Sequence, residues 1–240
     1  MSASRPLLAI IAPAHATATT ITPSNADTSL SEGNANTNYG PDTNIAVEAD
    51  LGVTSIRGLV KFDLSSIPPG ISTINTASLQ LYYWSTVAGN PVNRIYTANR
   101  AITNNWGETT ATWNKYDGAL VWGTAGGDFT TTGAASQTVG VFGWMTWDVT
   151  AIVKAWIESG QPNYGFLIKD ANEGVGTGGG KGANFYSREA TDPNKPILTV
   201  DYTVRTAVIP EYPIGLPLLA IFMIIAYGLI KRRTRNPKNI

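Results

Sequence analysis

The feature that most constrains the fold is an alternation of apolar and polar positions with a period of two. In one segment Leu79, Leu81 and Tyr83 share one parity, whereas Tyr82 and Trp84 share the opposite parity. Successive side chains of a β-strand point to opposite faces of the sheet, so this pattern is typical of a strand with one buried face. The segment therefore predicts a strand that buries its odd-numbered residues and turns its even-numbered aromatic residues outward.

Similar strand-like segments recur at short spacing from residue 26 to residue 204. Residues 56–64 repeat the alternation and place Val60 and Phe62 on one face. Turns rich in proline and glycine separate these segments, as in residues 68–70 (Pro-Pro-Gly). A series of short strands divided by turns favours an all-β sandwich over residues 26–204.

One short helix is expected within the sandwich. Ile152 and Trp156 are four residues apart, as on one face of an amphipathic helix. Asp148 stands where an N-cap residue is expected, and Gly160 stands where a C′ residue would end the helix. A final strand is expected over residues 197–204. The predicted fold class is therefore an all-β sandwich with one short helix.

Composition excludes several classes of function. The chain contains no cysteine, and its only histidine, His15, falls in an N-terminal segment that we expect to be removed. Disulfides, Cys/His zinc sites and Ser-His or Cys-His catalytic pairs are thus excluded from the mature domain. Residues 17–209 hold 11 Lys and Arg against 16 Asp and Glu, a net charge of −5. Nucleic-acid binding needs a basic face, so we expect no nucleic-acid partner.

An apolar segment near the C-terminus predicts a transmembrane helix. Residues 214–230 are 17 consecutive uncharged, mostly apolar residues. A helix of that length spans about 26 Å, close to the thickness of a bilayer core. The basic tail, residues 231–240, follows directly and begins with Lys231, Arg232 and Arg233. Cationic residues favour the cytoplasmic side, so we expect the domain on the extracellular face of the cell membrane, anchored at its C-terminus.

The N-terminus has the order of parts of a secretory signal peptide. A positively charged start precedes a short apolar stretch, and Ala14 and Ala16 form a small-x-small cleavage site. We expect cleavage before Thr17. Residues 1–16 are then the signal peptide, and residues 17–25 are a linker that leads into the sandwich.

Residues 205–213 form an expected stalk that contains Pro210, Glu211 and Tyr212. These three residues stand directly before the apolar segment and the basic tail. The order of parts resembles the Pro-Glu-aromatic sorting signal of many archaeal surface proteins, with Tyr in place of the more usual Phe. The resemblance implies that an archaeosortase-type processing enzyme cuts near the motif and attaches the product to a lipid.

Seven short motifs occur in order along the expected sandwich: residues 38–40 (NYG), 60–68 (VKFDLSSIP), 77–82 (ASLQLY), 106–114 (WGETTATWN), 148–150 (DVT), 162–166 (PNYGF) and 185–189 (FYSRE). Together they resemble the DNRLRE-domain family, also called disaggregatase-related domains, which is grouped with carbohydrate-binding modules. The resemblance implies a jelly-roll-like β-sandwich of the kind found on secreted and surface-anchored microbial proteins.

Three aromatic residues are the candidates for contact with a sugar: Tyr82, Trp84 and Trp144. Parity directs Tyr82 and Trp84 away from the core, where flat rings can stack on a sugar ring. The alternative is that the helix or a long loop covers them. We interpret these residues as a candidate ligand-binding surface.

Three cationic residues are candidates to pair with uronate or sulfate groups of a ligand: Arg57, Lys61 and Arg188. The alternative is that they form structural salt bridges with acids such as Glu189. Trp106 and Glu108 could also belong to a ligand platform, but we favour a structural role in which the tryptophan packs in the core and the carboxylate binds backbone amides.

Oxygen-bearing side chains near the start of the domain suit a structural calcium ion, although they lack EF-hand spacing. They are Asp27, Glu32, Asn38, Asp42, Glu48 and Asp50. No other cofactor is expected.

The sequence as a whole predicts a non-catalytic cell-surface module whose partner is extracellular or cell-envelope polysaccharide. One alternative is a structural adhesin or filament subunit of the cell surface. The other is a polysaccharide hydrolase, which would need a carboxylate pair that sequence spacing alone does not identify.

Overall fold

The computed structural model describes residues 15–50, 54–102, 105–175, 179–204, 221–227 and 229–231. The chain divides into two units, of which residues 14–205 form the larger. We describe each unit by itself. The expected cleavage-site residue Ala14 and the expected sorting residues Pro210, Glu211 and Tyr212 lie outside the described residues.

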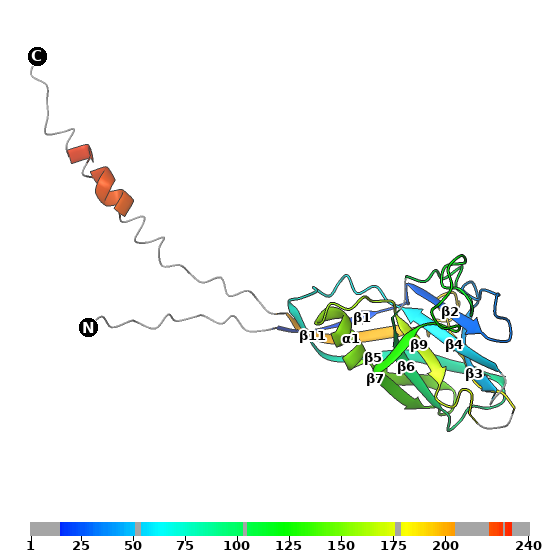
Figure 1. Cartoon of the computed structure of the whole chain (residues 1–240). Helices are drawn as coiled ribbons and strands as arrows, with labels where there is room; N and C mark the ends of the chain where they lie inside the picture. Colours follow the sequence, from blue (N-terminus) through cyan, green and yellow to red (C-terminus); the bar gives the residue numbers. More distant parts are fainter. Residues whose placement is uncertain are drawn as a thin grey trace, which may run out of the picture. The chain divides into compact units, whose positions relative to one another are not determined.

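The larger unit is built from antiparallel strands and one short helix (Figure 1). The strands are β1 (His15–Ile21), β2 (Ala26–Ser31), β3 (Asn44–Asp50), β4 (Thr54–Lys61), β5 (Ser72–Ala88), β6 (Ile95–Ala101), β7 (Phe129–Thr138), β8 (Gly143–Asp148), β9 (Phe166–Asp170), β10 (Lys181–Tyr186) and β11 (Ile197–Val204). Their hydrogen-bonded order is β1-β11-β5-β10-β3-β4-β9-β6-β7, with β2 paired to β4 and β8 paired to β5. The expected all-β fold class is confirmed.

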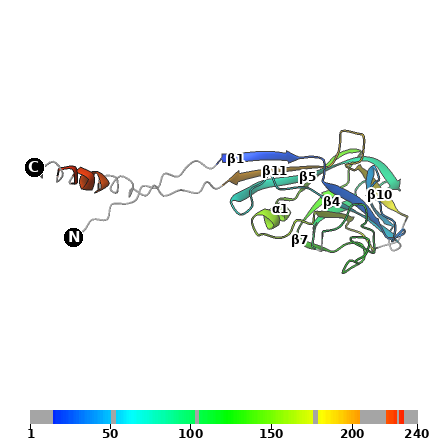
Figure 2. The same ribbon diagram turned by 90° about the horizontal axis from the view of Figure 1, so that it is seen from above.

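The sheet curls around a core, as Figures 1 and 2 show. Strand β5 is 17 residues long and pairs with β11, β8 and β10 along different parts of its length. Strand β7, at the far end of the hydrogen-bonded path, contacts β8, and helix α1 (Thr150–Ile157) packs against β5 and β7. The curl therefore brings distant parts of the path together around apolar side chains.

The main core follows the alternation seen in the sequence. On β5, Leu79 and Leu81 are fully buried, whereas Trp84 is 38% exposed. Full burial of one large apolar side chain contributes about 1.5–3 kcal/mol. Trp147 of β8 is also fully buried, and its Nε1 donates a hydrogen bond of 3.0 Å to the carbonyl oxygen of Tyr96. The polar atom of this buried ring is thus satisfied.

A second core lies on the other face of β4 and β9. Leu59 and Leu167 are buried there together with three tryptophans, Trp106, Trp113 and Trp122. These tryptophans come from the long loop between β6 and β7. The loop covers the sheet, so β4 and β9 bury side chains on both faces.

Helix α1 starts differently from the prediction. Its N-cap residue is Val149, which makes no side-chain cap. Asp148 lies one residue earlier, and its Oδ1 accepts a hydrogen bond of 3.1 Å from the Thr150 N–H and another from the Thr150 hydroxyl. Gly160 has a left-handed φ of 66°, but it stands two residues after the C-cap residue Glu158, not one. Asp148 and Gly160 therefore belong to the turns before and after the helix, and neither is its cap residue.

The N-terminal edge of the unit is a strand. Residues 17–21, which the sequence placed in a linker, belong to β1 and pair with β11; Ala16 pairs with Thr203. The start of β1 and the end of β11 lie at the same end of the sandwich (Figure 2). Strand β11 has the bounds expected from the sequence.

The smaller unit contains helical residues 221–227 and 229–231, whose side chains are exposed. Among the described residues, no helix has the length and apolar character needed to cross a membrane. Residues 214–220 of the expected membrane segment lie outside the described residues.

Candidate functional site: an aromatic platform on β5, β8 and β10

Four aromatic side chains lie on the face of β5, β8 and β10 that points away from the main core. Tyr82 and Trp84 belong to β5, and their parity is opposite to that of the buried residues. Trp144 of β8 is the register partner of Tyr82. Tyr186 ends β10, the neighbour of β5 on its other edge. We call these four residues the aromatic platform.

The rings of the platform contact one another. The Trp84 and Tyr186 rings are stacked, with centroids 5.3 Å apart and planes at 2°. Tyr186 also stacks on Tyr82, with a centroid distance of 5.9 Å. Tyr82 meets Trp144 edge to face at 5.2 Å. Such pairs contribute about 0.5–1.5 kcal/mol beyond the burial of area, so the rings hold one another in place before any ligand arrives.

The platform leaves large apolar surfaces in contact with solvent. Trp84 is 38% exposed and Trp144 is 41% exposed. Exposed apolar residues that gather in one patch mark interaction sites more often than scattered ones do. The alternative raised from the sequence was that the helix or a long loop covers Tyr82 and Trp84; Trp84 keeps 38% of its surface exposed, whereas Tyr82 is half-buried.

Polar groups border the rings. The Nε1 of Trp84 donates a hydrogen bond of 3.1 Å to Oδ1 of Asn44, which orients the indole. Desolvation and then the charge of Asp192 raise the pKa of the Tyr186 hydroxyl above its ordinary value. Flat apolar rings beside amide and hydroxyl groups match a sugar, which has apolar ring faces and hydroxyl groups at its edges.

The structure brings together the three aromatic residues singled out from the sequence and adds a fourth. Tyr82, Trp84 and Trp144 lie in one patch, and their role in binding stays a prediction. Tyr186 was missed, although Phe185 and Tyr186 alternate between core and surface as the residues of β5 do. That alternation was the available signal.

The three candidate cations bind groups of this chain. Arg57 holds Glu173, with Nη2 2.9 Å from Oε2, and its guanidinium lies over the Trp113 ring at 4.9 Å. Lys61 donates a hydrogen bond of 2.8 Å to Asn105. Arg57 thus forms the kind of salt bridge that the structural alternative describes, whereas Lys61 contacts an amide.

Arg188 lies among acidic side chains. Its Nη1 is 2.8 Å from Oε2 of Glu108, and its Nε is 3.5 Å from Oε1 of Glu189. The salt bridge to Glu189 was the alternative that the sequence raised. A role of Arg57, Lys61 or Arg188 in recognition of anionic sugars stays a prediction.

A polar hollow of about 400 Å³ lies beside Arg57 and is also lined by Trp113, Phe129 and Glu173. A second hollow of about 650 Å³ adjoins it at Arg57 and Phe129. The charges of Arg57 and Glu173 neutralise each other at a distance of 2.9 Å. Neither charge of this ion pair is therefore free to bind a ligand in the hollows. The hollows also do not contain the stacked rings of the aromatic platform.

The tryptophan motif of residues 106–114 is structural, as favoured from the sequence. Trp106 is 2% exposed, and its Nε1 donates a hydrogen bond of 2.7 Å to the Tyr164 carbonyl. Oε1 of Glu108 accepts a hydrogen bond of 2.9 Å from the backbone N–H of Asp27. This motif fastens the long loop to the sandwich.

The residues suggested as calcium ligands do not gather in one place. Glu32 accepts a hydrogen bond of 2.9 Å from the Ser55 N–H. Asp27 instead lies with Glu108 and Glu189, the one group of three potential metal-ligating side chains among the described residues.

Comparison with known protein families gives a match. The model of carbohydrate-binding module family 96 matches residues 17–202, which is more than half of the chain. No curated protein matches the chain. The match confirms the carbohydrate-binding-module part of the resemblance, whereas the DNRLRE-domain and sorting-signal resemblances stay predictions. The chain belongs to carbohydrate-binding module family 96.

Proposed function

We propose that this protein is a non-catalytic module that binds polysaccharide through the aromatic platform. The observation that carries the proposal is the row of contacting rings formed by Tyr82, Trp84, Trp144 and Tyr186, of which Trp84 and Trp144 are exposed. Membership of a carbohydrate-binding module family supports it. Both point to recognition of sugars, and neither depends on the other.

The dimensions of the platform favour a polymer over a single sugar. The rings come from three adjacent strands, β8, β5 and β10. Neighbouring strands lie about 4.8 Å apart, so the row extends over roughly 10 Å. That length exceeds one sugar ring. If each stacked ring contributes about 1–1.5 kcal/mol, several rings together give affinities from micromolar to millimolar.

The carboxylates favour binding over hydrolysis. Glycoside hydrolases use two carboxyl groups that flank the scissile bond, about 5–9.5 Å apart. In the cluster of Asp27, Glu108 and Glu189, one oxygen of each carboxylate lies within 4.8 Å of the others, and Asp27 is 1% exposed. A glycosidic oxygen cannot reach a carboxyl group that is buried in this way.

The proposal includes a location on the cell surface. Its support is the order of parts in the sequence, an apolar run over residues 214–230 followed by Lys231, Arg232 and Arg233. Protease added to intact cells should degrade the domain. Complete protection of the domain in intact cells, with digestion after lysis, would contradict this location.

The binding proposal is tested by affinity electrophoresis of the full chain in gels that contain neutral, uronate-bearing or sulfated polysaccharides. At least one polymer should retard the protein, and Trp84→Ala should remove most of the retardation. Leu120→Ala is the matched control, because Leu120 is 56% exposed but lies outside the platform. Retardation that Trp84→Ala leaves unchanged would place the binding elsewhere.

The same exposed rings could serve the alternative, a surface adhesin or filament subunit that self-associates. Light scattering in detergent distinguishes the two. Concentration-dependent association that Trp84→Ala abolishes, without retardation on any polysaccharide, would favour self-association over sugar binding.

A further inference from the structure

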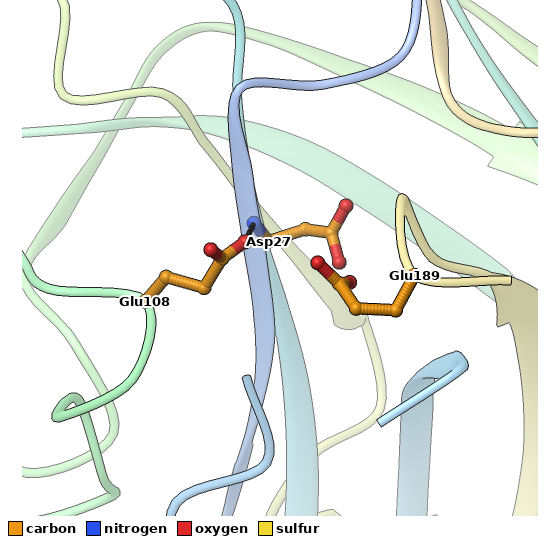
Figure 3. A group of neighbouring side chains, drawn as sticks. All are labelled: Asp27, Glu108 and Glu189. Atoms are coloured by element: carbon orange, nitrogen blue, oxygen red, sulfur yellow. Dashed lines mark hydrogen bonds between the residues drawn. The ribbon is translucent and has the colours of Figure 1, made fainter. Parts of the chain in front are cut away.

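A cluster of three carboxylates has no part in the aromatic platform. Asp27 comes from β2, Glu108 from the loop between β6 and β7, and Glu189 from the loop between β10 and β11. One oxygen from each lies within 4.8 Å of the others. Figure 3 shows the carboxylates of Asp27 and Glu189 turned toward one another, with Glu108 beside them. Segments far apart in the sequence thus bring acidic groups together.

Two oxygens of the cluster are buried without a hydrogen-bond partner. Asp27 is 1% exposed, and its Oδ1 has no partner. The Oε2 of Glu189 is likewise buried and unpaired. The second oxygen of Asp27, Oδ2, accepts hydrogen bonds from the Ser24 hydroxyl and from the Arg188 N–H. An unpaired buried polar atom costs about 1–3 kcal/mol, and more when it is charged, so these oxygens point to a partner that binds between them.

The charges of the cluster are not balanced by the chain. Arg188 forms a 2.8 Å ion pair with Glu108 and a 3.5 Å ion pair with Glu189, so it offsets one of three negative charges. Burial, together with the charges of Glu189 and Glu108 and against the hydrogen bonds from Ser24 and Arg188, raises the pKa of Asp27 to about 7. Lys61 also lies near enough for the charge of Glu108 to act on it, so three carboxylates face two cations of the chain and an excess of negative charge remains.

The carboxylates are held in position by the fold. The Asp27 N–H fixes one oxygen of Glu108 at 2.9 Å, and the Asn38 amide donates to the Glu108 carbonyl at 2.7 Å. Gly40 passes so close to that carbonyl that a Cβ at this position would overlap it. The NYG motif thus locks the Glu108 segment against the cluster, as a preorganised ligand site requires.

We propose that Asp27, Glu108 and Glu189 bind a calcium ion that ties β2 to the two loops. Calcium prefers oxygen ligands at 2.3–2.6 Å, so two oxygens on opposite sides of the ion are at most about 5 Å apart. The 4.8 Å spread of the cluster fits that limit. All three side chains are carboxylates, which suit a hard cation and not a soft transition metal.

The test is a titration of the purified full chain, in detergent, with calcium chloride after treatment with EDTA. Isothermal titration calorimetry should show one saturable site. At calcium concentrations of about 100 times Kd, the melting temperature should rise by roughly 5–10 °C for a domain of this size. Magnesium chloride at equal concentration should have a smaller effect, because Mg²⁺ gives up its water reluctantly.

Variants assign the site. Glu189→Gln should weaken calcium binding at least about tenfold, since it removes one charged ligand. Asp27→Asn should weaken calcium binding in the same way. If Asp27→Asn fails to fold, Glu189→Gln still tests the site, because the Glu189 side chain is 26% exposed and its substitution disturbs the fold less. Asp201→Asn on β11 is the control and should bind as the wild type does.

Two results would overturn the proposal. The first is the absence of both binding heat and a thermal shift at millimolar calcium. If the EDTA-treated wild type is then stabilised by acid alone, a proton shared between the two unpaired oxygens occupies the cluster. The second is calcium binding that Asp27→Asn and Glu189→Gln leave unchanged, which would place the ion elsewhere.

Discussion

At the scale of single residues, a buried ion pair joins two parts of the sandwich. Arg94, just before β6, contacts Asp170 at the end of β9, with a distance of 2.7 Å from Nη2 to Oδ2. Arg94 is 8% exposed and Asp170 is fully buried. Oδ1 of Asp170 accepts a further hydrogen bond of 2.8 Å from the Asn172 N–H. The carboxylate is thus satisfied only while Arg94 is present.

We expect Arg94→Ala to lower the free energy of unfolding by about 3–5 kcal/mol, because it leaves the Asp170 charge buried without a partner. Urea unfolding followed by tryptophan fluorescence measures this. Adding Asp170→Ala should recover part of the loss. The control Arg100→Ala, at a half-buried arginine of β6, should cost less than about 1 kcal/mol. If Arg94→Ala and Arg100→Ala lowered the free energy of unfolding equally, the buried ion pair of Arg94 with Asp170 would not be a main source of stability.

Which residues lie on the outer face could be predicted from the sequence, but which charges meet could not. Parity places Tyr82 and Trp84 outside because the two faces of a strand are a local property. The partner of Arg57 is Glu173, 116 residues away. Such a contact depends on the pairing of β4 with β9 and on the loop after β9, neither of which is encoded near Arg57.

At the scale of elements, the start of helix α1 depends on Asp148. The hydrogen bonds from the Thr150 hydroxyl and then from the Thr150 N–H lower the pKa of Asp148 below its ordinary value. Thr150 in turn binds β5, since its hydroxyl accepts a hydrogen bond of 2.9 Å from the Ala77 N–H. Asp148 therefore links the end of β8 to the helix and to β5.

We expect Asp148→Ala to lower the free energy of unfolding by about 1 kcal/mol, the usual net contribution of an intramolecular hydrogen bond, because it removes the acceptor of the Thr150 N–H and hydroxyl. The folded-state pKa lies below the unfolded value of about 4, so the carboxylate stabilises the fold above that pH. This contribution is lost as the pH falls through the folded-state pKa. Asp148→Asn keeps an acceptor and should cost less and show no such pH dependence. Equal pH profiles for wild type and Asp148→Asn would contradict the assignment.

The existence of α1 and most of β5 could be predicted from local pattern, whereas β1 could not. Residues 16–21 (ATATTI) are mostly threonine and alanine and show no apolar alternation. β1 lies at the edge of the sheet and is largely exposed, so burial does not select apolar residues there. Only its pairing with β11, at the other end of the domain, makes it a strand.

At the scale of the whole molecule, the sandwich closes without the C-terminal residues. β11 ends at Val204 and lies between β1 and β5. Residues 14–205 form a compact unit by themselves. Leu198 and Val200 of β11 belong to the main core. The chain that follows is therefore not needed to bury the core.

Deletion of residues 206–240 should give a soluble, folded protein whose melting temperature matches that of the domain in the full chain. Circular dichroism of the released protein checks this. Deletion of residues 197–240, which also removes β11, is the matched control and should unfold the domain, because Leu198 and Val200 are fully buried. An aggregated product from the shorter deletion would mean that the C-terminal segment belongs to the core.

The strand order and the curl of the sheet could not be predicted from the sequence. Period two identifies strands but does not say which strands pair. Strand β5 pairs with three other strands, and two of them, β8 and β10, bring Trp147 and Phe185 into contact in the core. The aromatic platform arises from this pairing, because Tyr186 of β10 stacks on Trp84 of β5 only when these two strands lie side by side.

The central claim, that the platform binds polysaccharide, is tested most directly by calorimetric titration of Tyr82→Ala/Trp84→Ala with a polymer that retards the wild type. Loss of two stacking rings should weaken binding about 100-fold or abolish it. The variant loses three ring contacts of about 0.5–1.5 kcal/mol each, so its melting temperature should fall by several degrees while the domain stays folded at the temperature of the titration. Wild-type affinity in this folded variant would contradict the account.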